Sequence, residues 1–139
     1  MELPGAAQRV TFTVREIANY LTSAGFAPIY ENAVPLTVDS VIVLTEYGGR
    51  NSWGELCCAI KWERPRLQIL VRGAPFDEAT PRANIEAISK KLSTIQNEDV
   101  DARTFYAMAT PIQAPFKLAV DSLGRVSFVV NFEFEKNIS

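Results

Sequence analysis

The sequence contains no histidine, only two cysteines and no long apolar run, and each absence excludes a class of function. Without histidine, the chain cannot build a Ser–His–Asp or Cys–His catalytic arrangement. The cysteines, Cys57 and Cys58, are adjacent. They therefore lack the spacing of a disulfide framework or of a zinc site, and we expect both to be reduced. No apolar run approaches the roughly 20 residues that cross a bilayer, so we expect no membrane association.

The chain also lacks a marked excess of charge. Its 139 residues carry 14 Lys and Arg against 16 Asp and Glu, and the pI is about 5.2. A phosphate-binding surface needs a basic field, so this balance argues against one, although Arg64, Arg66 and Arg72 fall close together. The length and the 47% hydrophobic content are typical of one globular domain, and we interpret residues 1–139 as a single domain. The acidic Glu2 and the lack of an apolar segment after it indicate no signal peptide.

Two short motifs that suggest ligand binding are incomplete. The acids Glu98, Asp99 and Asp101 lack the glycine and the downstream glutamate of a calcium loop, so we interpret them as a solvated loop. The sequence 48–50, Gly-Gly-Arg, lacks the wide glycine frame and the Lys-Ser/Thr pair of a phosphate-binding loop. We therefore predict no catalytic residue, no cofactor and no metal site.

The clearest pattern that is present lies near the C-terminus. Every second residue from 126 to 134 is large and apolar, namely Val126, Phe128, Val130, Phe132 and Phe134. The residues between them are mostly polar. This alternation predicts a strand with one face in a core. The segment 116–120 precedes it as a second apolar run, and Asp121 to Gly124 forms a turn signal between the two. The sequence therefore predicts a hairpin.

Two amphipathic helices are also predicted. The first follows Thr13, which forms a capping-box pattern with Glu16, and it ends at Gly25. The second begins near Asp77 or Thr80. Its buried face recurs at steps of three and four residues: Ile85, Ile88, Leu92 and Ile95.

The remaining patterns predict the rest of a sheet. Strands are expected at 28–31, 41–46, 66–73 and 103–109, and residues 47–54 read as a glycine-containing loop. The predicted fold is α+β, with a mixed, mostly antiparallel sheet of about five to six strands and two helices packed on one face. Val43, Val71 and Val129 are then expected to leave the other face partly apolar, as a contact surface.

Three segments together resemble a known family. They are Leu44-Thr45-Glu46-Tyr47-Gly48-Gly49, then Arg64 to Gly73, then Asp121 to Phe134 with its Gly124-Arg125 start and Asn131-Phe132 finish. Their order and spacing resemble those of the tail terminator, or tail completion, proteins of long-tailed bacteriophages, over about residues 13 to 135. The stretch from Trp53 to Glu63 is longer than expected for that family, and the adjacent cysteines are not a mark of it.

The resemblance implies a small structural subunit of a hexameric ring, not an enzyme. Such a ring caps the head-proximal end of the tail tube, stops tube growth and joins the tail to the neck. The expected partners are further copies of the chain, the tail tube protein, neck or connector proteins, and DNA passing through the lumen. The expected location is the virion, after assembly in the host cytoplasm. The expected interface residues, for contacts between subunits or along a DNA channel, are Tyr47, Gly48, Gly49, Arg50, Trp53, Arg66, Arg72 and Arg125.

Two other kinds of function remain open from the sequence. A head–tail connector or a tail tube component belongs to the same assembly and shares the plan of sheet and helices. A small-ligand binding module belongs to a different class, and it would place a ligand groove between the sheet and its helices. An enzyme would have to work with carboxylates or with Cys57 and Cys58 alone.

Overall fold

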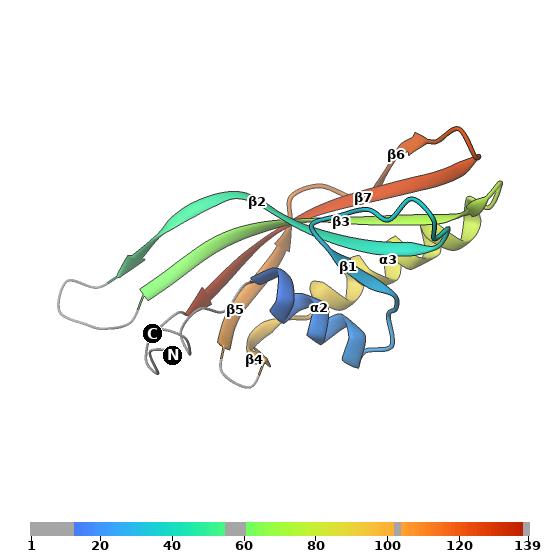
Figure 1. Ribbon diagram of the computed structural model, residues 1–139. Coiled ribbons are helices and arrows are strands. Elements are labelled where there is room, and N and C mark those ends of the chain that lie inside the picture. Colours follow the sequence, from blue (N-terminus) through green and yellow to red (C-terminus); the bar gives the residue numbers. More distant parts are fainter. Residues whose placement is uncertain (1–12, 55–60, 102–103, 138–139) are drawn as a thin grey trace, which may run out of the picture.

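The computed structural model describes residues 13–54, 61–101 and 104–137. The prediction about Cys57 and Cys58 concerns residues outside this described part. Figure 1 shows the described helices and strands. In chain order they are α2 (Thr13–Ser23), β1 (Ile29–Glu31), β2 (Val41–Gly54), β3 (Lys61–Pro75), α3 (Ala79–Leu92), β4 (Gln96–Asp101), β5 (Thr104–Pro111), β6 (Phe116–Val120) and β7 (Arg125–Asn137).

The described strands form one seven-stranded sheet in the order β1-β2-β3-β7-β5-β4, with β6 also paired to β7. β1 and β2 are parallel, and each of the other described pairs is antiparallel. The α+β class and the mixed, mostly antiparallel sheet are confirmed, with one strand more than expected. That strand is β4, where we expected a solvated loop: Glu98 lies opposite Tyr106, and Asp99 opposite Phe105. The acidic residues suggested a loop, but a strand at the edge of a sheet also tolerates charged residues.

The predicted alternating strand is the centre of this sheet. β7 pairs with β3 along one side, and with β5 and β6 along the other. The five residues of its predicted apolar face are each at most 5% exposed: Val126, Phe128, Val130, Phe132 and Phe134. The hairpin of β6 and β7 is also confirmed, and the Gly124 N–H donates to the Asp121 carbonyl at 3.0 Å to close its turn.

The first helix lies where it was predicted. α2 is followed by Gly25, whose φ of 99° is a conformation that glycine adopts readily. Ile17 and Leu21 are fully buried on its inner face. These apolar residues lie on the side of the helix that belongs to the core cluster.

Glu16 of α2 has a different role from the capping interaction that the sequence suggested. Its carboxylate is buried and accepts hydrogen bonds from the Thr104 hydroxyl and from the Tyr106 hydroxyl, the latter at 2.7 Å. The ammonium of Lys136, on β7, lies 3.2 Å from the same carboxylate. Burial raises the pKa of Tyr106, and the negative charge of Glu16 raises it further. A glutamate three residues after a threonine fits a capping box and a buried ion pair equally well, so the sequence could not distinguish them.

α3 begins at Ala79, between the two predicted starts. Asp77 Oδ1 accepts a hydrogen bond from the Thr80 N–H at 3.1 Å, which satisfies an amide that the helix itself leaves unpaired. Pro81 lies in the first turn, where proline is tolerated. The buried face includes three fully buried residues as predicted: Ile85, Ile88 and Leu92.

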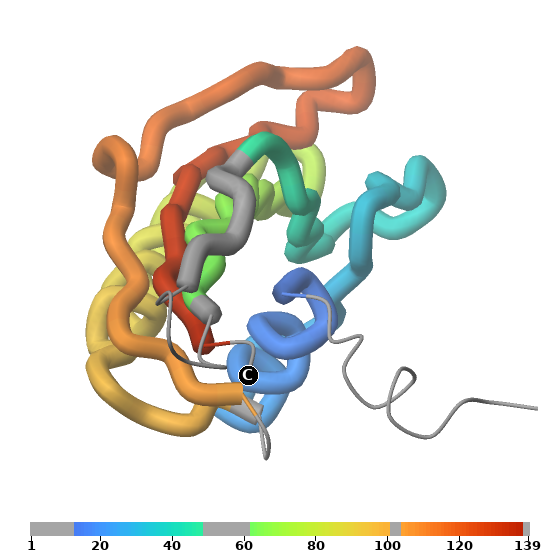
Figure 2. Tube along the Cα trace, turned by 90° about the vertical axis from the view of Figure 1, so that its left-hand side faces the viewer, coloured from blue at the N-terminus to red at the C-terminus, as the bar shows by residue number. Residues whose placement is uncertain are grey.

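One hydrophobic cluster joins buried residues of both helices to alternate residues of β2, β3 and β7. α3 lies against β3 and β7, whereas α2 lies against β1, β2 and β4. Because β1 and β4 are at opposite ends of the strand order, the sheet must curve around α2 to reach it with both (Figure 2). The core is therefore enclosed by a curved sheet.

Candidate protein-interaction surfaces

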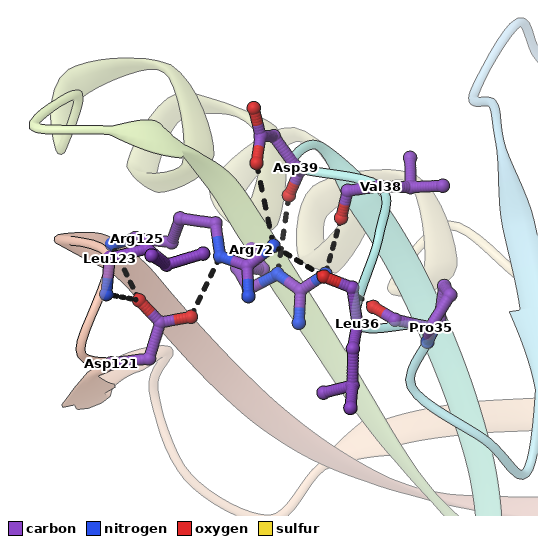
Figure 3. Close-up of polar contacts among 8 residues, drawn as sticks. All are labelled: Pro35, Leu36, Val38, Asp39, Arg72, Asp121, Leu123 and Arg125. Carbon is purple, nitrogen blue, oxygen red and sulfur yellow. Dashed lines mark hydrogen bonds and ion pairs between the residues drawn. The ribbon is translucent and has the colours of Figure 1, made fainter.

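Arg72, near the end of β3, is enclosed by the loop between β1 and β2. Only 5% of the residue is exposed. Its guanidinium donates hydrogen bonds to the backbone carbonyls of Pro35, Val38 and Asp39 (Figure 3). The Pro35 oxygen lies at 2.5 Å and the Asp39 oxygen at 3.2 Å. Because a guanidinium carries five donors in a fixed plane, this one side chain can bind three carbonyls of the loop and hold the loop against the sheet.

Arg125, the first residue of β7, binds the same loop and the turn before it. Its Nη1 donates to the Leu36 carbonyl at 3.0 Å and lies 3.4 Å from Asp39 Oδ1. Its Nε donates to Asp121 Oδ2 at 2.7 Å. Asp121 Oδ1 accepts the backbone N–H groups of Leu123 and Arg125, both at 2.9 Å. One guanidinium therefore links the turn between β6 and β7 to the loop before β2 (Figure 3).

We call Arg72, Arg125, Asp39 and Asp121 the arginine cluster. Burial lowers the pKa of Arg72, and the neighbouring positive charge of Arg125 lowers it further. The backbone N–H of Arg125 lowers the pKa of Asp121, and the guanidinium of the same residue adds to the effect. The two carboxylates thus balance two guanidinium groups that lie close together in a partly buried setting.

At the other end of the sheet, β2 and β3 form an antiparallel arm, which we define as residues 47–54 and 61–66 (Figure 1). On its other edge, this part of β3 pairs with the end of β7, from Trp62 opposite Asn137 to Arg66 opposite Glu133. The prediction of a loop at Tyr47–Gly54 is wrong, because this backbone pairs with β3 as far as Gly54 opposite Lys61. The pairing shifts register on both sides of Arg50, and Gly48 has a φ of 49°. The strand therefore continues, with bulges, through residues that we had predicted to follow its end.

Two arginines of the arm form ion pairs with β7. Arg66 Nε lies 3.1 Å from Glu133 Oε1, and Arg64 Nη2 lies 3.6 Å from Glu135 Oε2. The arginine side chains are 39% and 32% exposed, respectively. Alternation along β3 places both on the face opposite Leu67, which is in the core cluster. Water and salt can therefore reach these pairs.

The structure does not bring the eight predicted interface residues together. Arg72 and Arg125 belong to the arginine cluster, where both are bound inside the chain. Arg66 and Arg72 are six positions apart on β3, about 20 Å along an extended strand. Tyr47 is 36% exposed. The residues that do lie together are those of the arm: Tyr47, Gly48, Gly49, Arg50, Trp53 and Arg66.

The exposed apolar sheet face that we expected is not found at the residues named for it. Val43 and Val129 are each only 2% exposed. Val71 points to the opposite face, into the core cluster. These strands are therefore covered on both sides at these residues, and the inference of an exposed face was wrong.

Exposed apolar side chains instead gather around β6, a surface that the sequence analysis did not identify. In β6 they are Phe116 at 41%, Leu118 at 51% and Val120 at 52% exposure. Three further residues lie in loops that the arginine cluster or Gly124 touches: Leu36 at 76%, Phe76 at 90% and Leu123 at 55% exposure. The sequence feature that could have indicated this surface is that β6 carries a single charged residue, Lys117.

Phe76 is the most exposed of these residues and has a strained backbone. Its φ is 61°, which is rare for a bulky residue. Its N–H donates to the Gly124 carbonyl at 2.9 Å. A Cβ added to Gly124 would lie 2.8 Å from the Phe76 ring, so the ring needs a glycine beneath it. Strain of this kind persists only where the surrounding structure imposes it.

The described residues contain no metal cluster and no membrane-spanning helix. Within ranges 13–54, 61–101 and 104–137, no group of three or more acids and cysteines is arranged to hold a metal ion. Neither described helix has the length and apolar character needed to cross a membrane. One buried acceptor, Asn131 Oδ1, has no hydrogen-bond partner in the described part of the chain.

Comparisons with known proteins found similarity over most of the chain. The family described as "Bacteriophage tail terminator protein" matches residues 20–138. Among solved structures, a chain from the virion of a native gene transfer agent particle is similar, with a TM-score of 0.56 and 14% identity. The similarity covers 94% of this chain and 90% of that chain. At this identity it concerns the fold alone. No curated protein matches the sequence.

Proposed function

This chain belongs to the bacteriophage tail terminator family, and we propose that it is a structural virion protein that caps the head-proximal end of a phage tail tube. In this role it stops tube growth and joins the tail to the neck, without catalysing a reaction. The observation that carries the proposal is the family match over residues 20–138. The fold shared with a chain of a phage-like virion supports it.

The proposed assembly is a hexameric ring formed in the host cytoplasm, with the tail tube protein and neck proteins as partners at its two openings. Each contact in a closed ring is heterologous, so one surface must fit a different surface on the neighbour. We further propose that both helices cover the same face of the sheet. Their shared core cluster supports this arrangement, which leaves the arm for contacts.

The arm is the proposed contact to a neighbouring subunit or to the tube. Its exposed Tyr47 and the exposed pair of Arg66 and Glu133 support this assignment. Arg50 and Arg66 would supply charged contacts between subunits or line a channel for DNA. Arg72 and Arg125 are bound inside the chain, so their proposed contribution is indirect: they fix the shape of the neighbouring surface.

The solution mass of the purified protein tests ring formation. Light scattering should give 6 × 15.4 = 92.4 kDa for six copies of the 15.4 kDa chain, and negative-stain images should show annular particles. The sample should be measured alone and after mixing with purified tail tubes, because a ring can require the tube to close. A protein that stays monomeric or dimeric and leaves the tubes uncapped would contradict the proposal.

A double substitution tests the arm. Tyr47→Ala with Trp53→Ala should abolish ring formation, measured by the same light scattering. Tyr30→Ala is the matched control, because Tyr30 is an aromatic residue of β1 that lies outside the arm. Intact rings from the double variant would disprove the role of the arm.

A further inference from the structure

The sheet has unpaired edges that are protected to different degrees. Within the described part of the chain, β1 and β4 end the strand order. β1 has only three residues, and β4 carries several acids: Glu98, Asp99 and Asp101. α2 lies against both strands. Short length, charge and a covering helix are the devices by which proteins keep a sheet edge from pairing with another chain.

β6 is less protected than these two strands, because it carries a single charge and no described helix packs against it as α2 packs against them. It pairs with β7 on one side and with no other described strand. All five of its residues are exposed, and three of them are large and apolar. Its one charged residue, Lys117, is engaged by Glu78, with the two groups 2.9 Å apart. An apolar edge with free backbone groups associates with other strands unless a functional partner covers it.

The surroundings of β6 are apolar and held in place. The arginine cluster binds the Leu36 carbonyl and the turn that carries Leu123. Phe76, packed over Gly124, adds the most exposed aromatic ring. Because Arg125 is already paired with Asp121, this end of the molecule offers little free positive charge to a nucleic acid. Fixed apolar groups with few free charges are typical of the centre of a protein–protein contact.

A second unpaired edge lies at the opposite end of the sheet (Figure 1). β1 pairs with β2 only from Ile42 to Leu44, and Asn32 Oδ1 accepts the Glu46 N–H at 3.4 Å just beyond. From Tyr47 to Gly54, the outer edge of β2 therefore has no partner strand in the described part. Besides the short or acidic outer strands β1 and β4, the part of the chain that the structure describes thus leaves an edge of β6 and an edge of the arm without a partner strand.

We propose that β6 of one copy pairs with the arm edge of β2 in a second copy, so that the sheet continues from subunit to subunit. The inference rests on the proposed ring, in which every contact joins two different surfaces of the same chain. Addition of a strand to a free edge gives affinity through backbone hydrogen bonds, and the flanking side chains give specificity. In this pairing, the apolar groups around β6 become the buried centre of the contact.

Two single-edge variants test this pairing. The first variant, Leu118→Lys, has a charge on the β6 edge and an intact arm. The second variant combines Tyr47→Ala with Trp53→Ala in the arm and has an intact β6. Each alone should be a monomer of 15.4 kDa, whereas the wild type forms rings. Their mixture should give a dimer of 2 × 15.4 = 30.8 kDa and nothing larger, because it contains one intact arm facing one intact β6.

The matched control is Met108→Lys. Met108 is 47% exposed, and this fraction is similar to the 51% of Leu118. It lies on β5, which is paired on both sides. This control should form rings, and both lysine variants should unfold near the wild-type temperature because Leu118 and Met108 are exposed. The unfolding temperature of the arm variant is measured in the same way, so that a loss of rings can be told from a loss of folding. Rings from Leu118→Lys, or a mixture that stays monomeric, would overturn the pairing while leaving the ring itself intact. A wild-type protein that never forms rings, even with tail tubes, would instead contradict the proposed function.

Discussion

Positive side chains of the sheet are used in opposite ways in two regions of the molecule. The enclosed region has two parts, the arginine cluster with Arg72 and Arg125 and the surroundings of Lys136 at the opposite end of β7. These three residues are at most 5% exposed and bind carbonyl or carboxylate groups of the same chain. On the arm, the side chains of Arg64 and Arg66 are 32% and 39% exposed and form ion pairs with glutamates of β7. In the sequence, all five are simply basic residues within or beside strands.

The difference shows that burial decides the contribution of a charge. When the partner of an enclosed cation is removed, a buried charge is left unpaired. When the cation itself is removed, a carboxylate or a carbonyl loses its hydrogen-bond donor. An exposed pair exchanges its partner for water at little loss. We therefore expect the enclosed region to govern stability and the arm to govern association.

The largest effect is expected at Lys136. Lys136→Met removes the cation that lies 3.2 Å from the buried Glu16 carboxylate, so the free energy of unfolding should fall by about 3–5 kcal/mol. Urea denaturation measures the change. Lys117→Met is the control, because Lys117 is an exposed lysine paired with Glu78, and its effect should stay within about 1 kcal/mol. Equal effects for the two variants would remove the distinction between the regions.

The next effect is expected at Arg72. Arg72→Met leaves three loop carbonyls without their donor, and the free energy of unfolding should fall by about 2–4 kcal/mol. Hydrogen exchange should also become faster at residues 33–40, which a general loss of stability alone would not single out. Arg82→Met, at an exposed arginine of α3, is the control. Unchanged exchange in the loop would show that Arg72 does not hold it.

Asp121 should give a smaller effect that depends on pH. Its pKa is lowered in the folded chain, so its stabilising contribution is present above the unfolded value of about 3.9 and is lost as pH falls through the folded value. Asp121→Asn should therefore be less stable than the wild type at neutral pH and lose less stability on acidification. Thermal unfolding between neutral and acidic pH tests this, and parallel curves would contradict it.

The smallest effect is expected on the arm. A double-mutant cycle with Arg66→Ala and Glu133→Ala should give a coupling of about 0.2–1 kcal/mol, because water reaches both partly exposed side chains. The coupling should weaken further as salt is added. A coupling above about 2 kcal/mol, beyond the range for exposed pairs, would place this pair with the enclosed cations.

The elements that the sequence predicted well are those with a local pattern. β7 alternates from Val126 to Phe134, and α3 repeats its apolar residues every three or four positions. Such periodicity reflects which residues face the core, whatever the rest of the fold does. The hairpin of β6 and β7 followed in the same way from the turn residues Asp121 to Gly124.

The elements that were missed depend on residues far apart in the chain. The arm backbone at Tyr47–Gly54 is extended because β3 pairs with it, and its glycines alone suggest a loop. β4 is a strand because β5 lies beside it, despite its acids. The arginine cluster joins Asp39, Arg72 and Arg125, which no local window contains. The exposed edge of β6 became visible only when the partners of every other strand were known.

The most direct test of the proposed function is whether this protein ends the growth of a tail tube. Purified protein should be added to assembling tail tube protein, and tube lengths and ends should be measured by electron microscopy. We expect elongation to stop and a ring to appear at one end of each tube. Tubes that keep growing, with no ring at either end, would contradict it.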